Sequence, residues 1–96
     1  MIKIYDFYAK WCGPCLQMEP TVRMMMEKFP RLVRKVDVDK DAELALKFGV
    51  TSIPLLVAVK VGDGREEEVL ERLLGKQTKA DLLTFFNKYG EYNGKQ

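Results

Sequence analysis

Hydrophobic positions along this chain fall into two kinds of pattern, short β-type runs and longer stretches with helical spacing. Residues 2–8 and 32–38 are rich in β-branched and aromatic side chains, and each segment predicts a strand. Residues 55–61 form a nearly continuous apolar run, which is typical of a strand buried on both faces. Residues 66–74 favour a helix by propensity, but the turn at residues 62–64 and the short span favour a hairpin partner, so we predict a fourth strand.

Three further segments have the spacing of amphipathic helices. The first covers residues 13–28, where apolar side chains recur at roughly helical intervals from Leu16 onward. Pro20 lies inside this segment, and we expect a kink there because proline removes one backbone hydrogen bond and crowds the preceding turn. The second helix is predicted over residues 41–48, and the third over residues 78–89.

The predicted element order is β-α-β-α-β-β-α. It gives an α/β fold in which a four-stranded mixed sheet is flanked by three helices. The first crossover joins parallel strands in the right-handed sense, and the final hairpin adds antiparallel strands. The chain has 96 residues, so we expect one domain, residues 1–96. We expect Gly90 to end the last helix and residues 91–96 to form a frayed tail.

Charge and length argue against several classes of protein. The net charge is +2, which is too weak to predict binding to nucleic acid or to an anionic membrane. No apolar run approaches the roughly 20 residues that span a bilayer, and the first residues lack the apolar core of a signal peptide. We therefore expect a cytoplasmic protein, with a phage or an archaeon as the candidate source. The acidic run at residues 66–68 is expected to be a solvated face of the hairpin.

The two cysteines carry the most informative chemistry, since both lie in one Cys-Gly-Pro-Cys segment and the chain has no histidine. In a reducing compartment so close a pair is typical of catalytic or redox-sensing thiols. We expect Cys12 to precede the first helix and Pro14 and Cys15 to open it, where free N–H groups and the helix dipole stabilise a thiolate. Cys12 is therefore the expected nucleophile, and Cys15 the expected buried resolving thiol.

Three other interpretations of the cysteine pair have less support. A structural disulfide that closes so short a loop would stabilise the fold little by chain entropy. A zinc site needs four ligands, whereas the chain offers two thiols and no imidazole, so we expect no metal. The third interpretation is a pair of inert buried cysteines.

Several short segments together resemble the thioredoxin family over about residues 2–89. The family's active-site signature is matched by Trp11-Cys12-Gly13-Pro14-Cys15. Further matches at the family's spacing are Asp6-Phe7-Tyr8-Ala9, Pro20, Lys35, Ile53-Pro54 and Gly75.

The resemblance implies roles for two residues outside the signature. Asp6 would be a buried proton acceptor for Cys15, and Lys35 would be the ionic partner of Asp6. Elementary electrostatics supports this, because burial should raise the pKa of Asp6 and a nearby ammonium should offset part of that rise. Such a carboxyl group can take the Cys15 proton through a water as a general base. The alternative is a solvated aspartate at the end of the strand.

The resemblance also implies a substrate groove beside the disulfide. The Ile53–Pro54 peptide bond would be cis, and the main chain of Ile53 would pair with an extended segment of the substrate, which gives broad specificity. Trp11 would cover the disulfide; the alternative for this side chain is simple core packing. The residues assigned to substrate binding in this way are Trp11, Gly13, Pro14, Ile53, Pro54 and Gly75.

The chain departs from the family pattern because it begins at the active-site strand, without the family's usual first strand and first helix. In this it resembles the short glutaredoxin-like thioredoxins of archaea and phages. We predict a thioredoxin-type protein-disulfide reductase. One alternative is a glutaredoxin-like hydrogen donor recharged by glutathione, for instance to ribonucleotide reductase, although glutaredoxins favour Pro-Tyr between the cysteines. The other is a non-catalytic accessory subunit, which would have no use for Asp6 and Lys35 beside both thiols.

The resemblance finally implies which partners to expect. They are proteins that contain disulfide bonds, and a thioredoxin reductase that recharges the chain. We expect no bound cofactor, no nucleic-acid or membrane partner, and a monomer.

Overall fold

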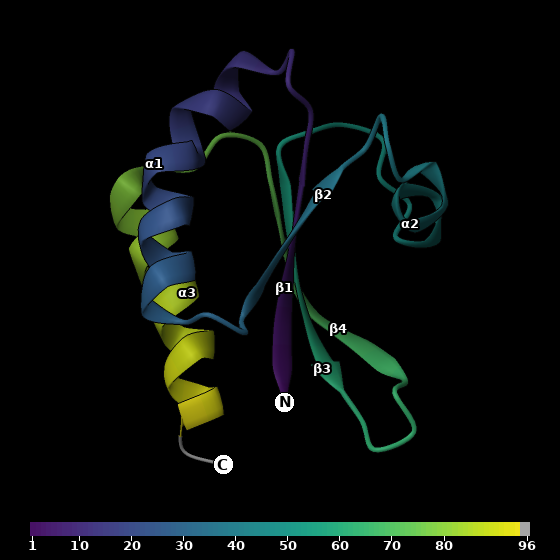
Figure 1. Cartoon of the computed structure of the whole chain (residues 1–96), viewed down its shortest axis with the longest axis vertical. Helices are drawn as coiled ribbons and strands as arrows, with labels where there is room; N and C mark the ends of the chain where they lie inside the picture. Colours follow the sequence, from purple (N-terminus) through teal and green to yellow (C-terminus); the bar gives the residue numbers. More distant parts are fainter. Residues whose placement is uncertain (95–96) are drawn as a thin grey trace.

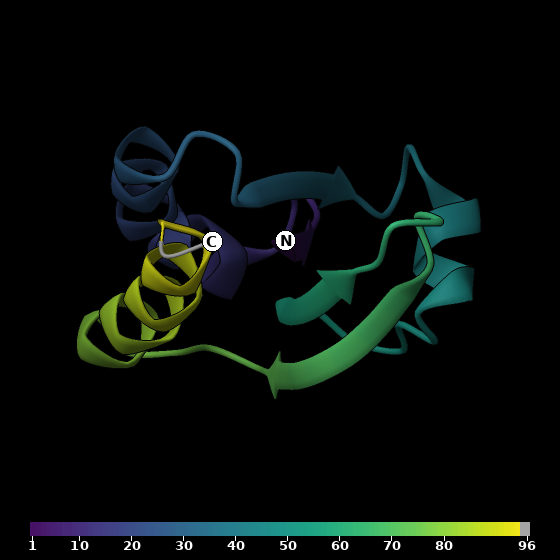
Figure 2. The same cartoon turned by 90° about the horizontal axis from the view of Figure 1, so that it is seen from below.

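The computed structural model describes residues 1–94 and contains the predicted order of elements. The strands are β1 (Ile2–Tyr8), β2 (Val33–Asp37), β3 (Leu55–Val61) and β4 (Glu67–Leu74). The helices are α1 (Gly13–Lys28), α2 (Ala42–Lys47) and α3 (Lys79–Gly94). Helices α1 and α3 cover one face of the sheet and α2 covers the other, so the molecule has three layers (Figures 1 and 2).

The strands form one mixed sheet in the order β2-β1-β3-β4. Strand β1 pairs with β2 in parallel and with β3 antiparallel, and β3 pairs antiparallel with β4. This confirms the predicted α/β fold, including the choice of a strand for residues 66–74. The central position of β1 places the chain that leads into Cys12 in the middle of the sheet.

Alternation along β1 divides the core between the two faces of the sheet. Ile2 and Ile4 pack against α1 and α3, whereas Tyr5 and Phe7 pack on the side of α2. Strand β3 is apolar at every core position because both of its faces are covered, as the sequence predicted. Asp6 therefore points to the same face as Ile2 and Ile4, toward α1, and it is 4% exposed.

Two expectations about the helices are wrong. Leu16 was expected on the buried face of α1, but it is 56% exposed, and Met18 is buried in its place. Gly90 does not end the last helix, because α3 continues to Gly94. Residues 91–94 are thus helical and are not a frayed tail; the rest of that predicted tail, residues 95–96, lies outside the described residues.

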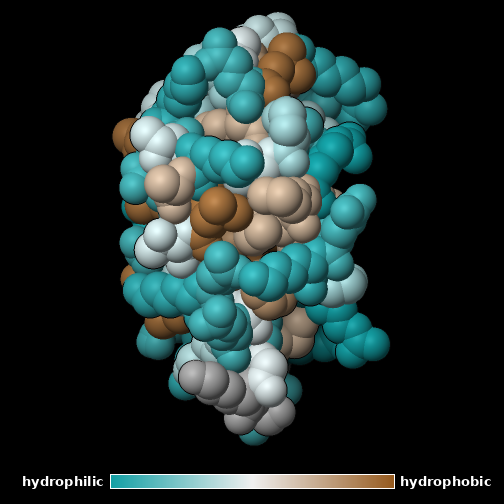
Figure 3. All heavy atoms as spheres, turned by 90° about the vertical axis from the view of Figure 1, so that its left-hand side faces the viewer, coloured by the Kyte–Doolittle hydropathy of each residue, from teal (hydrophilic) through white to brown (hydrophobic). Residues whose placement is uncertain are grey.

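Helices α1 and α3 turn a largely hydrophilic outer face to the surroundings, with small separate hydrophobic areas (Figure 3). Met24 and Leu16 of α1 are among its exposed apolar side chains. Asp41 is the N-cap residue of α2, and its carboxylate accepts a hydrogen bond from the Leu44 N–H at 3.0 Å. Gly49 follows the C-cap residue Phe48 and has a φ of +63°, which suits glycine.

Candidate active site

Three connecting segments meet at one end of the molecule, the upper end in Figure 1. They are the loop from β1 into α1, the segment from α2 into β3, and the segment from β4 into α3. The peptide bond between Ile53 and Pro54 is cis, as the resemblance implied. The Gly75 N–H donates a hydrogen bond to the Pro54 carbonyl at 2.8 Å, and Gly75 has a φ of +89°. This bond holds the second and third segments together beside the first.

Cys12 and Cys15 form a disulfide at the start of α1, with their Cα atoms 5.3 Å apart. Cys12 is the N-cap residue, in an extended conformation, and its Sγ accepts a hydrogen bond from the Cys15 N–H at 3.3 Å. Pro14 lies in the first turn, where its missing N–H costs no helical bond. The sulfur of Cys12 therefore lies where the free N–H groups of α1 and its dipole favour negative charge.

The surroundings of the disulfide are otherwise apolar. Both cysteines are buried, Cys12 with 4% and Cys15 with 6% of its surface exposed. They pack with Ala9, and Tyr8 and Ile53 lie against this cluster. The polar group that contacts a sulfur here is the Cys15 N–H at the start of α1.

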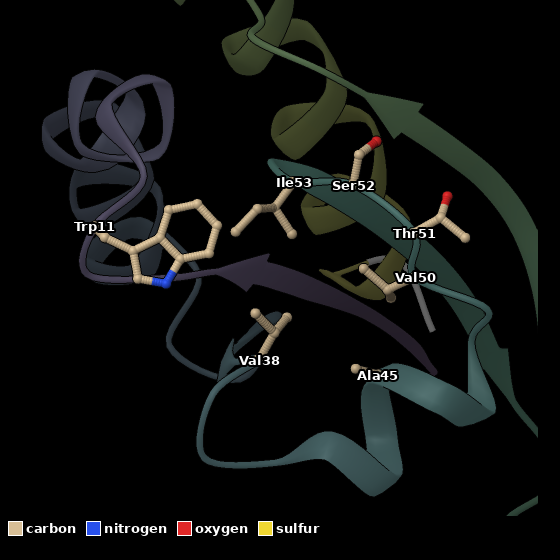
Figure 4. A pocket seen from close by; sticks show the side chains of 7 residues that line it. All are labelled: Trp11, Val38, Ala45, Val50, Thr51, Ser52 and Ile53. Carbon is tan, nitrogen blue, oxygen red and sulfur yellow. The ribbon is translucent and has the colours of Figure 1, made fainter.

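A groove of about 450 Å³ lies next to this cluster, since Val38 and Ile53 both line the groove and pack against the cysteines (Figure 4). Its floor is apolar, and Ile53 points toward the indole of Trp11 while the hydroxyl of Ser52 points away from it. The lining residues are Trp11, Val38, Ala45, Val50, Thr51, Ser52 and Ile53. We call this site the Trp11 groove.

Trp11 forms one wall of the Trp11 groove rather than part of the core. It is 70% exposed, so the alternative of simple core packing is wrong. Its Nε1–H donates a hydrogen bond to Asp39 Oδ2 at 2.8 Å, which fixes the ring although the side chain is solvated. Of the other residues assigned to substrate binding, Gly13 and Pro14 are exposed, Ile53 is half-buried and Pro54 is buried.

A group of charged side chains lies beneath α1. Asp6 pairs with Lys35 across the parallel β1–β2 register, and Lys35 Nζ lies 3.3 Å from Asp6 Oδ2. Lys35 Nζ also contacts Glu19 Oε2 on α1. Glu19 in turn accepts from Arg23 Nε at 3.0 Å. The predicted Asp6–Lys35 pair is therefore present, but it belongs to a larger group that includes Glu19.

The carboxyl group of Asp6 has a perturbed proton affinity. Burial raises its pKa above the ordinary value, the ammonium of Lys35 opposes that rise, and the negative charge of Glu19 adds to it. Asp6 is therefore a carboxyl group that can bind and release a proton closer to neutral pH than a solvated aspartate. The alternative of a solvated strand-end aspartate is wrong.

Sequence reasoning missed two residues of this site. Glu19 stands four positions after Cys15, so helical spacing places it one turn further along the same side of α1. That spacing was the available signal. For Asp39 there was no such signal, because no local pattern connects it with Trp11, which is 28 positions away in the sequence.

Other kinds of site are not found in the part of the chain that the structure describes. Within residues 1–94, side chains of histidine, cysteine, aspartate and glutamate do not gather in groups of three that could hold a metal ion. None of the helices in the same residues is both long enough and apolar enough to cross a membrane.

Comparison with known proteins gives consistent matches. The family model described as Thioredoxin matches residues 2–88. The chain is 36% identical over 87 residues to thioredoxin of Chlamydia muridarum, covering 90% of this chain and 80% of that protein. It is 38% identical over 86 residues to thioredoxin of Listeria monocytogenes, covering 88% and 79%.

Solved structures agree with the sequence matches. A mutant thioredoxin from Halobacterium salinarum superposes with a TM-score of 0.75 at 37% identity, covering 93% of this chain and 74% of that one. Thioredoxin from Plasmodium falciparum gives a TM-score of 0.77 at 31% identity, covering 92% and 81%. Because sequence and fold match over nearly the whole described length, with the disulfide at the start of α1, this chain belongs to the thioredoxin family.

Proposed function

We propose that this protein, a thiol–disulfide oxidoreductase with Cys12 and Cys15 as its redox pair, reduces disulfide bonds in other proteins with Cys12 as the nucleophile and Cys15 as the resolving thiol. The observation that carries the assignment is the disulfide at the N-terminus of α1 beside the Trp11 groove. The N-cap position of Cys12 supports its role, because a thiolate there receives the N–H groups of the first turn.

The reaction consists of two thiol–disulfide exchanges. In the first, the Cys12 thiolate attacks one sulfur of the substrate disulfide. That bond breaks, a mixed disulfide forms, and the other substrate sulfur leaves as a thiolate that takes a proton from water. In the second, Cys15 loses its proton and attacks Cys12 Sγ, and the second substrate thiolate leaves. Two electrons pass to the substrate, and the protein is left with the Cys12–Cys15 disulfide.

Asp6 is the proposed acceptor of the Cys15 proton, through a water molecule. Its burial beneath α1 and its raised pKa support this role, because an efficient general base has a pKa near the working pH. Lys35 is the proposed partner that makes ionised Asp6 tolerable in a buried position.

The Trp11 groove is the proposed site for the substrate segment next to its disulfide. Trp11 and Ile53 supply apolar contact, and the main chain of Ile53 is proposed to pair with the substrate in the manner of an added strand. Main-chain pairing ignores side-chain identity, so broad specificity follows. Gly13, Pro14, Pro54 and Gly75 are proposed to shape the rim of this surface.

Family membership implies disulfide-containing substrates and a thioredoxin reductase as partners in general. For this chain we propose a reductase that recharges the Cys12–Cys15 disulfide, a cytoplasmic location and a monomeric state. The glutathione-linked donor and the accessory subunit are not favoured by the comparisons, which find thioredoxins.

The assignment of the two thiols is tested by trapping. Cys15→Ser is expected to form a stable 1:1 mixed disulfide with a small disulfide-containing protein, because the attacking thiol remains and the resolving thiol is gone. Cys12→Ser is expected to form no adduct and to reduce nothing, and the double serine variant is the matched control. Mass spectrometry with and without dithiothreitol reads the result. An adduct on Cys12→Ser but not on Cys15→Ser would reverse the two roles.

The reduction potential separates the remaining alternatives. Equilibration against a dithiothreitol or glutathione series is expected to give about −270 mV, the value of a reducing thioredoxin. A value near −200 mV, in the range of glutaredoxins, would favour the glutathione-linked donor. Full biological activity of the double serine variant would instead favour the accessory subunit.

A further inference from the structure

The ammonium of Lys35 lies among groups from two elements, strand β1 and helix α1. It lies 3.3 Å from Asp6 Oδ2 on β1 and contacts Glu19 Oε2 on α1. Its charge also lies 4.1 Å from the centroid of the Tyr8 ring, within the range of a cation–π interaction. Glu19 is itself held on its other oxygen by Arg23 at 3.0 Å. The side chain of Lys35 is therefore fixed between two carboxylates.

Burial differs sharply between these two carboxylates. The side chain of Asp6 is 5% exposed, whereas that of Glu19 is 23% exposed and that of Arg23 is 71% exposed. The side chain of Glu19 is thus partly exposed to solvent, whereas the buried carboxylate of Asp6 depends on Lys35 to compensate its charge. When Asp6 takes up a proton, Lys35 is not left unpaired, because Glu19 still neutralises it.

We propose that Glu19 is a positioning residue of this active site, which holds the ammonium of Lys35 partly on α1 and thereby leaves Asp6 free to exchange a proton. The proposal rests on the proposed function of Asp6 as proton acceptor. Glu19 acts through Lys35 and not by contact with substrate or with the reacting sulfurs. The negative charge of Glu19 also raises the pKa of Asp6 directly, in the same direction.

The remaining neighbours of Asp6 do not supply a competing charge. On β3 its register partner is Leu56, which is apolar. Helix α3 contributes Leu82, Phe85 and Phe86 to the core on this face, and the hydroxyl of its Tyr89 is bonded to Glu71. Within residues 1–94, the charged groups that bear on Asp6 are thus Lys35, Glu19 and, through Glu19, Arg23.

The test follows the titration of the Asp6 carboxyl group by carbon-13 NMR in the oxidised protein, where the disulfide prevents the thiols from titrating. Glu19→Gln is expected to move the midpoint of the Asp6 titration to lower pH, because the ammonium of Lys35 then pairs with the carboxylate of Asp6 alone. Arg23→Gln is the matched control: it removes a charge from the same cluster and is expected to leave the midpoint unchanged or to raise it. An unchanged or higher midpoint in Glu19→Gln, or an equal fall in Arg23→Gln, would overturn the proposal.

Activity supplies the second readout. In single turnover with a mixed disulfide on Cys12, Glu19→Gln is expected to slow the resolving step at neutral pH by about two- to fivefold, the effect of one partly solvated charge pair. Its pH dependence should shift in the same direction as the NMR midpoint. If Glu19→Gln does not fold, Glu19→Ala gives the same expectation in a residue that suits a helix.

Failure of the proposed function would look different. If Asp6→Asn resolves the mixed disulfide as fast as the unmodified protein, Asp6 is not the proton acceptor. The midpoint of the Asp6 titration in Glu19→Gln would still decide whether the ion pair with Glu19 weakens the pairing of Lys35 with Asp6. A normal Asp6→Asn defect together with an unmoved midpoint would overturn the role of Glu19 alone.

Discussion

At the scale of single residues, the carboxyl group of Asp6 sets function against stability. Its proposed role as proton acceptor requires the charged form, yet burial makes that form costly. Lys35 offsets part of this cost, and Glu19 limits how far it can do so. The same geometry that keeps the proton exchangeable therefore leaves the folded protein less stable at neutral pH than it could be.

This conflict gives a prediction for Asp6→Asn. Because the folded-state pKa of Asp6 lies above its unfolded value, the folded state holds more protons between the two values, and stability falls as pH rises through that interval. Above it, replacing the charge by an amide should raise the free energy of unfolding by about 1 kcal/mol or more. Lys35 remains paired with Glu19, so no new unpaired charge arises.

Urea unfolding at neutral and acidic pH checks this expectation. The gain should shrink at acidic pH, where Asp6 of the unmodified protein is already protonated. Equal or lower stability of Asp6→Asn at neutral pH would contradict the assignment of a costly buried charge.

At the scale of elements, Gly90 shows why α3 can pack on α1. It lies inside α3 and is buried, and a Cβ built at this position would approach the ring atoms of Phe29 to 2.6 Å. Phe29 is the C-cap residue of α1. Glycine is therefore required here by close approach rather than by the end of a helix.

Gly90→Ala tests this contact. Alanine improves helix propensity by about 1 kcal/mol, but overpacking against the ring costs about 1–3 kcal/mol, so we expect a net loss. Urea unfolding measures the difference. Gly94→Ala is the matched control in the same helix, since a Cβ there meets nothing within 4 Å. A stabilised Gly90→Ala variant would mean that the Phe29 ring moves aside freely.

Strand β4 presents one glutamate to each face of the sheet, Glu67 on the side of Tyr5 and Glu71 on the side of Tyr89. Its register against β3 shifts between Ala58 and Val59, which leaves one extra residue in β4. Glu67 and Glu71 are four positions apart and would share a face in a regular strand. The irregularity places them on opposite faces, where Glu67 binds Tyr5 and Lys47. The acidic run at residues 66–68 is thus not simply a solvated face.

At the scale of the whole molecule, two tyrosine–glutamate hydrogen bonds tie the layers to β4. Tyr5 OH donates to Glu67, and Tyr89 OH donates to Glu71 at 2.6 Å. Burial raises the pKa of Tyr5 to about 12, with further contributions from Glu67, and burial also raises the pKa of Tyr89 above its usual value. Burial would raise the pKa of Glu67 too, but its bonds from Tyr5 and Lys47 outweigh that and lower it.

The raised pKa values of Tyr5 and Tyr89 predict that the free energy of unfolding decreases in alkaline solution. An unfolded tyrosine loses its proton near pH 10, whereas Tyr5 keeps its proton to about pH 12 when folded, so stability falls as pH rises above about 10. The double variant Tyr5→Phe, Tyr89→Phe should lose about 1 kcal/mol per bond at neutral pH and show a shallower fall above pH 10. Denaturant unfolding across this pH range provides the measurement, and an equally steep fall in the double variant would contradict the account.

The sequence by itself determined the order of elements and the identity of the redox pair. Hydrophobic periodicity is a local property, and it marked most strands and helices within one or two residues of their observed ends. The exceptions are β4, which was recognised from the preceding turn, and α3, which continues past Gly90 to Gly94. The Cys-Gly-Pro-Cys segment is also local, since both cysteines lie at the N-terminus of their own helix and the Cys15 N–H bonds to Cys12 Sγ. Asp6 and Lys35 were found because the resemblance placed them, and the parallel register brought them together as it implied.

Only the tertiary structure decided which side chains become partners across elements. Glu19 on Lys35, Asp39 on Trp11 and Phe29 on Gly90 each join segments far apart in the sequence. No periodicity records such contacts, because they depend on how the layers are stacked. Leu16 and Gly90 were interpreted wrongly for the same reason. Propensity and spacing describe a helix alone, whereas exposure and close approach are fixed by what packs against it.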